Sequence, residues 1–92
     1  MKKTFLYHTD PGHGWMQVDF SELYALGLAE SISRYSYQDS EGNCYLEEDC
    51  DMTKFMEAYK AKYGGYPELT EVYHKEDCRI RRMKRYTTEL PV

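Results

Sequence analysis

The stretch Asp51-Met52-Thr53-Lys54-Phe55-Met56-Glu57-Ala58-Tyr59-Lys60-Ala61-Lys62-Tyr63 decides the fold class, because it has the clearest helical period in the chain. One apolar stripe runs along it at positions i, i+3, i+4, i+7 and i+11, formed by Met52, Phe55, Met56, Tyr59 and Tyr63. Asp51 is a favourable N-cap, and Gly64-Gly65 ends the helix. A helix with one apolar stripe needs a second layer to cover it, and the flanking segments supply the candidates.

Short strands are predicted on both sides of this helix, over residues 3–8, 15–18, 33–38, 44–47 and 69–74. Turn residues at 10–14 and 39–43 join the first four strands into two hairpins. A short second helix is predicted to begin at Asp19, with Glu22 three residues later, and to end near Gly27. Residues 79–86 fit either an edge strand or a tail, and residues 87–92 are expected to be a loose tail.

These elements predict an α+β fold in the order hairpin-helix-hairpin-helix-strand, with a mainly antiparallel sheet and two helices packed on one face. A chain of 92 residues has the size of a single domain, so we expect one unit over 1–92. The mean hydropathy of -0.81 and the lack of a long apolar run exclude a transmembrane helix. Three cysteines without tight spacing argue against a secreted disulfide scaffold, and we expect a soluble, cytoplasmic protein.

Charge and tyrosine content point to contact surfaces. Residues 1–74 hold 13 acids against 6 Lys or Arg, whereas residues 75–92 hold 3 acids against 6 bases. The chain also has 10 tyrosines, and a tyrosine brings a large apolar body with a polar tip to a half-buried sheet or a binding surface. We therefore expect some of the tyrosines to lie in the core and the others to serve recognition.

The first functional hypothesis is a protein-binding surface around the acidic run at 47–51. Carboxylates beside exposed tyrosines suit a basic partner, and the candidate residues are Tyr35, Tyr37, Tyr45, Glu47, Glu48, Asp49 and Asp51. The structural alternative is that the acids only favour the N-terminus of the following helix through its dipole. A calcium loop is excluded, because the run has no central glycine and no glutamate at the closing position.

A second hypothesis is nucleic-acid binding by the basic C-terminal segment. Its candidate residues are Arg79, Arg81, Arg82, Lys84 and Arg85, with Tyr73 and Tyr86 nearby. In a strand, Arg79, Arg81 and Arg85 would share one face. The overall acidity of the chain opposes this hypothesis, since nucleic-acid-binding domains are usually basic throughout.

A third hypothesis is a small zinc-binding protein that uses Cys44, Cys50, His74 and Cys78. Only the pair His74 and Cys78 has an acceptable ligand spacing, and His8, Asp10 and His13 form another conceivable cluster. The alternative is that Cys44 is an ordinary strand residue, that Cys50 is a small apolar residue near the start of the helix and that Cys78 is a free thiol. No nucleophile elbow, P-loop, dinucleotide fingerprint or zinc-protease motif is present, so we expect no catalytic residues, no cofactor and no metal.

Three strings carry a resemblance: Tyr7-His8-Thr9-Asp10-Pro11-Gly12-His13-Gly14-Trp15, Tyr35-Ser36-Tyr37-Gln38 and Tyr45-Leu46-Glu47-Glu48-Asp49-Cys50-Asp51. In these strings the chain resembles small proteins encoded on bacterial phages, plasmids and integrated mobile elements. That resemblance implies a bacterial cytoplasm and stoichiometric binding to a host or mobile-element protein, for example inhibition of a CRISPR or restriction system. It brings no catalytic residues, and it leaves a monomer and a homodimer open.

Overall fold

The computed structural model describes residues 3–76 and 78–88 and has the predicted α+β class. The strands are β1 (Thr4–Thr9), β2 (Gly14–Asp19), β3 (Tyr37–Gln38), β4 (Asn43–Glu47), β5 (Glu68–Tyr73) and β6 (Lys84–Arg85). The helices are α1 (Phe20–Ala25), α2 (Asp51–Tyr63) and the 3-10 helix η1 (Arg79–Arg82). Within the described ranges, none of the helices has the length and apolar character needed to cross a membrane.

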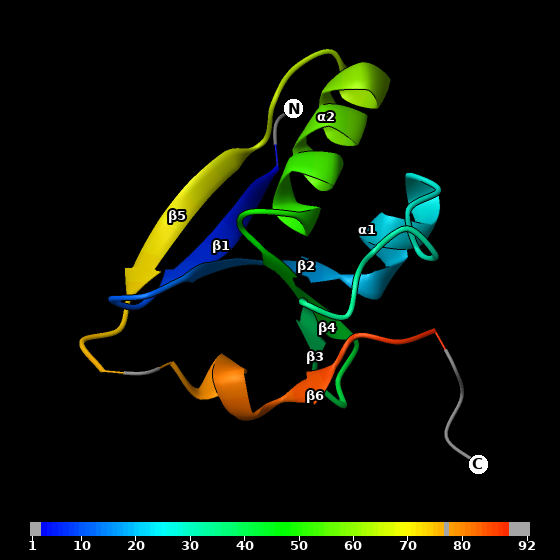
Figure 1. Cartoon of the computed structure of the whole chain (residues 1–92). Helices are drawn as coiled ribbons and strands as arrows, with labels where there is room; N and C mark the ends of the chain where they lie inside the picture. The colour runs from blue at the N-terminus through cyan, green and yellow to red at the C-terminus, as the bar shows by residue number, and fades with distance from the viewer. Residues whose placement is uncertain (1–2, 77, 89–92) are drawn as a thin grey trace.

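The six strands form one sheet in the order β5-β1-β2-β4-β3-β6 (Figure 1). Both expected hairpins are present: β1 pairs antiparallel with β2, and β3 pairs antiparallel with β4. After β4, α2 carries the chain to the far edge of the sheet, where β5 pairs with β1 in parallel. The sheet is therefore mainly antiparallel, with one parallel pair at the β5 edge.

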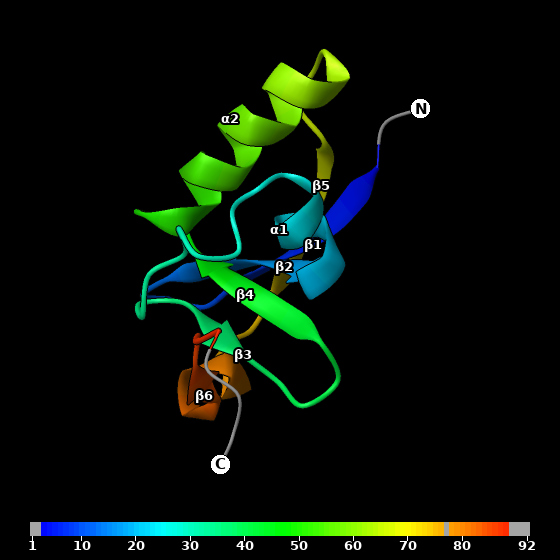
Figure 2. The ribbon, with the colours of Figure 1, turned by 90° about the vertical axis from the view of Figure 1, so that its right-hand side faces the viewer.

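Successive side chains of each strand point to opposite faces of the sheet, and we call the face that packs against α1 and α2 the helix face. On the helix face, Met16 of β2 lies opposite Leu46 of β4, and Phe5 of β1 and Val18 of β2 are buried on the same side. These residues form one buried cluster with Leu23 of α1, Phe55 and Tyr59 of α2, and Cys44 of β4. Figure 2 shows both α-helices on this side of the sheet and η1 with β6 on the other.

The opposite face has a second, smaller core. Trp15, Tyr37 and Tyr45 form a buried cluster with Cys78 and Ile80, against which Met83 packs. The segment 79–86 is therefore neither a tail nor one continuous edge strand. Burial of Ile80 folds it into η1, and only the two residues of β6 pair with β3.

The C-terminal segment then returns to the helix side of the molecule, where Tyr86 joins the main cluster. In the segment expected to be a loose tail, 87–92, the backbone N–H of Thr87 donates to Oε1 of Gln38 at 3.0 Å, and Thr88 is exposed. The remainder of that expectation, 89–92, lies outside the described residues.

Helix ends follow the predicted signals except at the start of α2. Asp19 caps α1 by accepting a hydrogen bond from the backbone of Ser21 at 2.8 Å, and Gly64 ends α2 with a φ of 85°. Asp51 is not an N-cap, because it is the first residue of α2 and its side chain is fully buried. Its carboxylate instead accepts hydrogen bonds from Ser33 and Ser36.

This buried carboxylate explains why the predicted strand over 33–38 is shortened to Tyr37–Gln38. Ser33 donates its backbone N–H and its hydroxyl to Asp51, at 3.0 and 2.6 Å, and the Ser36 hydroxyl donates at 2.5 Å. The Ser36 hydroxyl also accepts the backbone N–H of Glu47 at 3.0 Å. These hydrogen bonds hold the segment 33–38 against α2 and β4. The two tyrosines of this segment differ in burial, since Tyr35 is 69% exposed and Tyr37 is 8% exposed.

We expect Asp51→Ala to lower the free energy of unfolding by about 3 kcal/mol, because it leaves buried donors of Ser33 and Ser36 without an acceptor. Asp49→Ala is the matched control, since Asp49 is exposed and lies two residues away; its change should stay within about 0.5 kcal/mol. Urea denaturation of both variants measures the difference. Equal stabilities would contradict a structural role for Asp51.

Candidate functional site

A pocket of about 460 Å³ lies on the sheet face opposite the α-helices, beside the segment that contains η1 and β6. Strands, turns and the C-terminal segment all contribute side chains to it. Its lining residues are His13, Trp15, Tyr35, Tyr37, Glu47, Asp49, Cys50, Arg81 and Arg85. We call it the aromatic–acidic pocket.

The aromatic part of the pocket is closely packed. Trp15 is 2% exposed, and its ring meets the ring of Tyr37 edge to face with centroids 6.3 Å apart. Each ring also carries an arginine: the guanidinium of Arg81 lies 5.3 Å from the Trp15 centroid, and that of Arg85 lies 4.5 Å from the Tyr37 centroid. The C-terminal segment is therefore packed on the sheet through apolar and cation–π contacts together.

Asp10 fixes the position of Arg81. The guanidinium donates two hydrogen bonds to the Asp10 carboxylate, at 2.7 and 2.8 Å, and the backbone N–H of Cys78 donates a third at 3.0 Å. The backbone N–H groups of Gly12 and His13 add two more, each at 2.9 Å. The Arg81 guanidinium, together with these amide donors, holds the pKa of the Asp10 carboxyl far below its usual range against the effect of burial.

The acidic residues of the pocket, Glu47 and Asp49, have no arginine partner comparable to that of Asp10 among the described ion pairs. Glu47 is half-buried at the end of β4, and burial raises the pKa of its carboxyl, with a further contribution from the negative charge of Asp49. Its Oε2 accepts one backbone N–H, from Asp49 at 3.0 Å. Between described residues, none of the ion pairs involves Glu47 or Asp49. These two carboxylates are suited to receive a positive charge from outside the chain.

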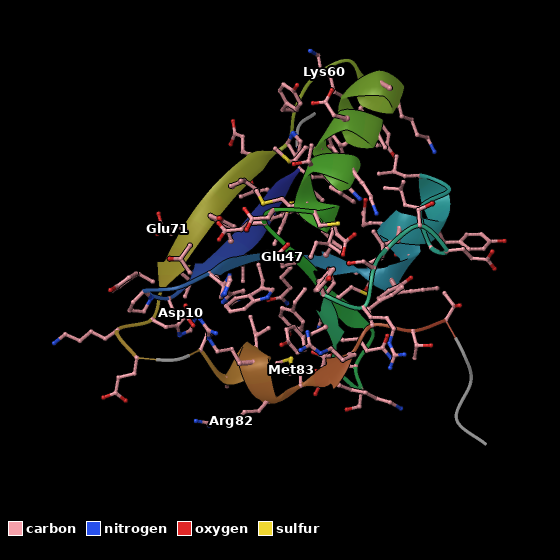
Figure 3. The ribbon with its side chains drawn as sticks, in the orientation of Figure 1. Asp10, Glu47, Lys60, Glu71, Arg82 and Met83 are labelled. Carbon is pink, nitrogen blue, oxygen red and sulfur yellow. The ribbon has the colours of Figure 1, made fainter. Side chains whose placement is uncertain are left out.

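The structure divides the residues predicted for protein binding into two groups. Tyr35, Tyr37, Glu47 and Asp49 come together at the pocket, and Glu48 lies next to them, accepting the Tyr7 hydroxyl at 2.7 Å. Figure 3 shows Glu47 at the centre of the molecule, between α2 and the segment of η1 and β6.

Tyr45 and Asp51 do not belong to this surface, because their exposed fractions are 3% and 0%. The Tyr45 hydroxyl donates to Asp39 at 2.9 Å, and burial together with this carboxylate raises the pKa of Tyr45 to about 12. Both residues are predicted as binding residues, and the structure places both in the interior, where their polar groups are hydrogen-bonded within the chain.

The basic residues are divided as well. Arg81 and Arg85 line the pocket, whereas Arg79, Arg82 and Lys84 are exposed, and Figure 3 shows Arg82 pointing away from the sheet. The predicted common strand face of Arg79, Arg81 and Arg85 is wrong, because η1 replaces the strand over the first two of them.

The predicted zinc ligands do not meet. Cys44 and Cys78 are buried in clusters on opposite faces of the sheet, and His74 contacts His8 instead, with 3.2 Å between Nε2 and Nδ1. Within 3–76 and 78–88, one group has three potential ligands within 4.8 Å of one another: His13, Glu48 and Asp49. The predicted cluster of His8, Asp10 and His13 is also dispersed, since Asp10 is engaged by Arg81.

Sequence analysis did not place His13, Trp15 or Cys50 in a protein-binding site, although it named His13 and Cys50 as conceivable metal ligands. His13 and Trp15 flank Gly14 at the end of the first hairpin turn, so the turn itself was the available signal. Gly14 is required there, because a Cβ would lie 2.4 Å from the Tyr7 hydroxyl oxygen.

Acid should weaken the attachment of the C-terminal segment. A carboxyl whose folded-state pKa is depressed stabilises the fold above its unfolded pKa, near 3.8, and this contribution is lost as the pH falls further. We expect the free energy of unfolding to change little from pH 7 to about 5 and to fall steeply below about 4.

The variant Asp10→Asn separates this contribution from that of other carboxylates. It should lose about 3 kcal/mol at pH 7, because it weakens a buried charge pair, and the two stability curves should converge in acid. Denaturation at a series of pH values measures both curves. Curves that stay parallel down to pH 2 would contradict the role given to Asp10.

Comparison with known proteins gives no match: no family model fits the sequence, and neither a curated protein nor a solved structure is significantly similar. The pocket is therefore the basis for a functional proposal.

Proposed function

We propose that this chain is a non-enzymatic, stoichiometric protein-binding module that takes a basic side chain of its partner into the aromatic–acidic pocket. The observation that carries this proposal is that Glu47 and Asp49, which form none of the ion pairs between described residues, line one cavity together with the aromatic rings of Trp15, Tyr35 and Tyr37. Aromatic faces and carboxylates both attract a guanidinium or ammonium group.

The two arginines of the pocket do not cancel this attraction. The charge of Arg81 is directed at Asp10, which accepts two hydrogen bonds from its guanidinium. Arg85 lies on the Tyr37 ring and donates to the carbonyl of Arg34 at 3.3 Å, at the exposed end of β6. Both arginines therefore contact groups of this chain, and the carboxylates of Glu47 and Asp49 are available to a basic side chain of the partner.

The resemblance to mobile-element proteins favours a host protein as the partner. Proteins of defence and nucleic-acid-handling complexes hold phosphates with clusters of Lys and Arg. A pocket that binds one such side chain, with Glu48 and the other carboxylates around it, would compete with nucleic acid for the same surface. In this proposal the chain acts as an inhibitor by occupation and performs no chemistry of its own.

The test compares three variants in a pull-down of tagged protein from bacterial lysate, read by mass spectrometry. Glu47→Gln and Asp49→Asn each keep the side-chain size and remove a carboxylate charge, and we expect each to reduce recovery of the partner at least about tenfold. Arg85→Gln is the matched control, because it removes a pocket charge of the opposite sign; it should retain the partner.

Two outcomes would overturn the proposal. Loss of the partner in Arg85→Gln with retention in both acidic variants would show that the guest is an anion. Recovery that disappears after nuclease treatment would show that nucleic acid is bound, through the exposed bases Arg79, Arg82 and Lys84. EDTA in a parallel sample controls for a metal ion at His13, Glu48 and Asp49.

A defined probe gives a second readout. Titration with N-acetylarginine amide should shift the NMR signal of the Trp15 indole N–H, and the same concentration of N-acetylaspartate amide should not. Binding should also slow alkylation of Cys50, which lines the pocket, whereas Cys44 and Cys78 are each 2% exposed. Equal shifts with both probes would contradict recognition of a basic group.

A further inference from the structure

The free edge of β5 is a feature that the pocket does not use. β5 ends the sheet beside β1, and no strand within 3–76 and 78–88 pairs with its outer side. It is six residues long, whereas the strand at the opposite edge, β6, has two residues. Figure 1 shows β5 along the outside of the sheet, and its residues are exposed except for Val72, which is half-buried. An open edge of this length can accept another strand.

The hydrogen bonds to β1 identify which backbone groups face outward. Glu68 donates its backbone N–H to Lys3 at 2.9 Å, and His74 donates to Thr9 at 2.7 Å, so even-numbered residues face β1. Because successive residues of a strand direct their backbone groups to opposite edges, Leu69, Glu71 and Tyr73 present theirs to the outside.

We propose that β5 pairs antiparallel with β5 of a second copy of this chain, with Glu71 opposite Glu71 at the two-fold axis. This register uses all three outward residues of each copy, because Leu69 then lies opposite Tyr73, and each hydrogen-bonded pair exchanges two backbone bonds. A register centred on Thr70 would place Tyr73 opposite Pro67, which has no backbone N–H to donate.

The side chains on both faces match this register. On the helix face, Leu69 and Tyr73 are 37% and 61% exposed, and self-pairing brings each against the other across the axis. On the opposite face, Glu68 lies across from His74, an acid opposite a residue that can donate to it. The complementarity of these two pairs selects a second copy as the occupant.

The one unfavourable pair is Glu71 with its own symmetry mate. Its Oε2 accepts the hydroxyl of Thr9 at 2.7 Å, so the carboxylate is held over β1, away from the axis. Like charges directly opposite each other still weaken a sheet, so this residue limits the affinity of the dimer. A variant at this position therefore tests the register as well as the association.

Sedimentation equilibrium of the whole chain over a range of concentrations gives the test. Glu71→Gln should lower the dimer Kd by about threefold, because it removes the like-charge pair. Glu71→Pro should raise the Kd at least about tenfold, since it deletes an outward N–H while leaving the ladder to β1 intact. Circular dichroism checks that both variants remain folded.

A disulfide provides the second test, in a Cys50→Ser background. Residues that form a hydrogen-bonded antiparallel pair have Cα atoms about 5.5 Å apart, within reach of a disulfide. Glu71→Cys should form a 71–71 linked dimer on mild oxidation, and Thr70→Cys, the matched control, should not link to itself. Mass spectrometry of the linked peptides identifies the pair.

Three results would overturn the inference: a wild-type chain that stays monomeric at about 1 mM, a dimer that survives Glu71→Pro, or a 70–70 disulfide. A monomer that captures another protein through β5, and loses it in Glu71→Pro, would also overturn it, because the occupant would then be a foreign strand. Glu47→Gln should leave the dimer unchanged, which keeps this inference independent of the proposed function.

Discussion

The buried carboxylate of Asp10 is the constraint on which the second layer of this protein depends. It lies in the turn after β1, and it holds Arg81 and the backbone of Cys78 from the other end of the chain. A buried carboxylate needs an opposite charge or hydrogen-bond donors close to it. For Asp10 these come from the segment around η1, which has little secondary structure of its own. Because that segment is held against the sheet, Trp15 and Tyr37 are buried beneath it, and a pocket forms beside them where the sheet face would otherwise be exposed.

Asp51 has the corresponding role on the other wall. Its hydrogen bonds to Ser33 and Ser36 place Tyr35 and Tyr37, and Ser36 in turn holds the backbone of Glu47. Both walls of the pocket are thus set by buried carboxylates before any partner arrives. Because the pocket residues are already held in place, binding a partner costs less side-chain and loop entropy. A contact through a few side chains can therefore still be specific.

The local elements of the fold could be predicted from the sequence, because their signals lie within short windows: the apolar stripe of α2, the turn residues of the two hairpins, and Asp19 before α1. The long-range placements could not. Nothing near β5 indicates that it pairs with β1, and Arg81 looks like any other base in its segment until Asp10 is placed beside it. Asp51 illustrates the same difficulty, since a carboxylate before a helical stripe is typical of an N-cap, and its actual partners are 15 and 18 residues away. Six pocket residues were nevertheless predicted as binding residues, four for a protein partner and Arg81 and Arg85 for nucleic acid, because charge and aromatic content mark a surface even where the contacts are unknown.

The sheet order connects the two proposals. The pocket is built on β2, β3, β4 and β6, and β1 stands between these strands and β5. Pairing through β5 would therefore extend the sheet without covering either pocket, and the two-fold axis would place both pockets on the same face of the extended sheet. A dimer with two equivalent pockets can engage two basic side chains on one partner, and the second contact then forms at a high effective concentration. In that arrangement a modest affinity at each pocket would be enough for the dimer to bind a basic surface of the partner tightly.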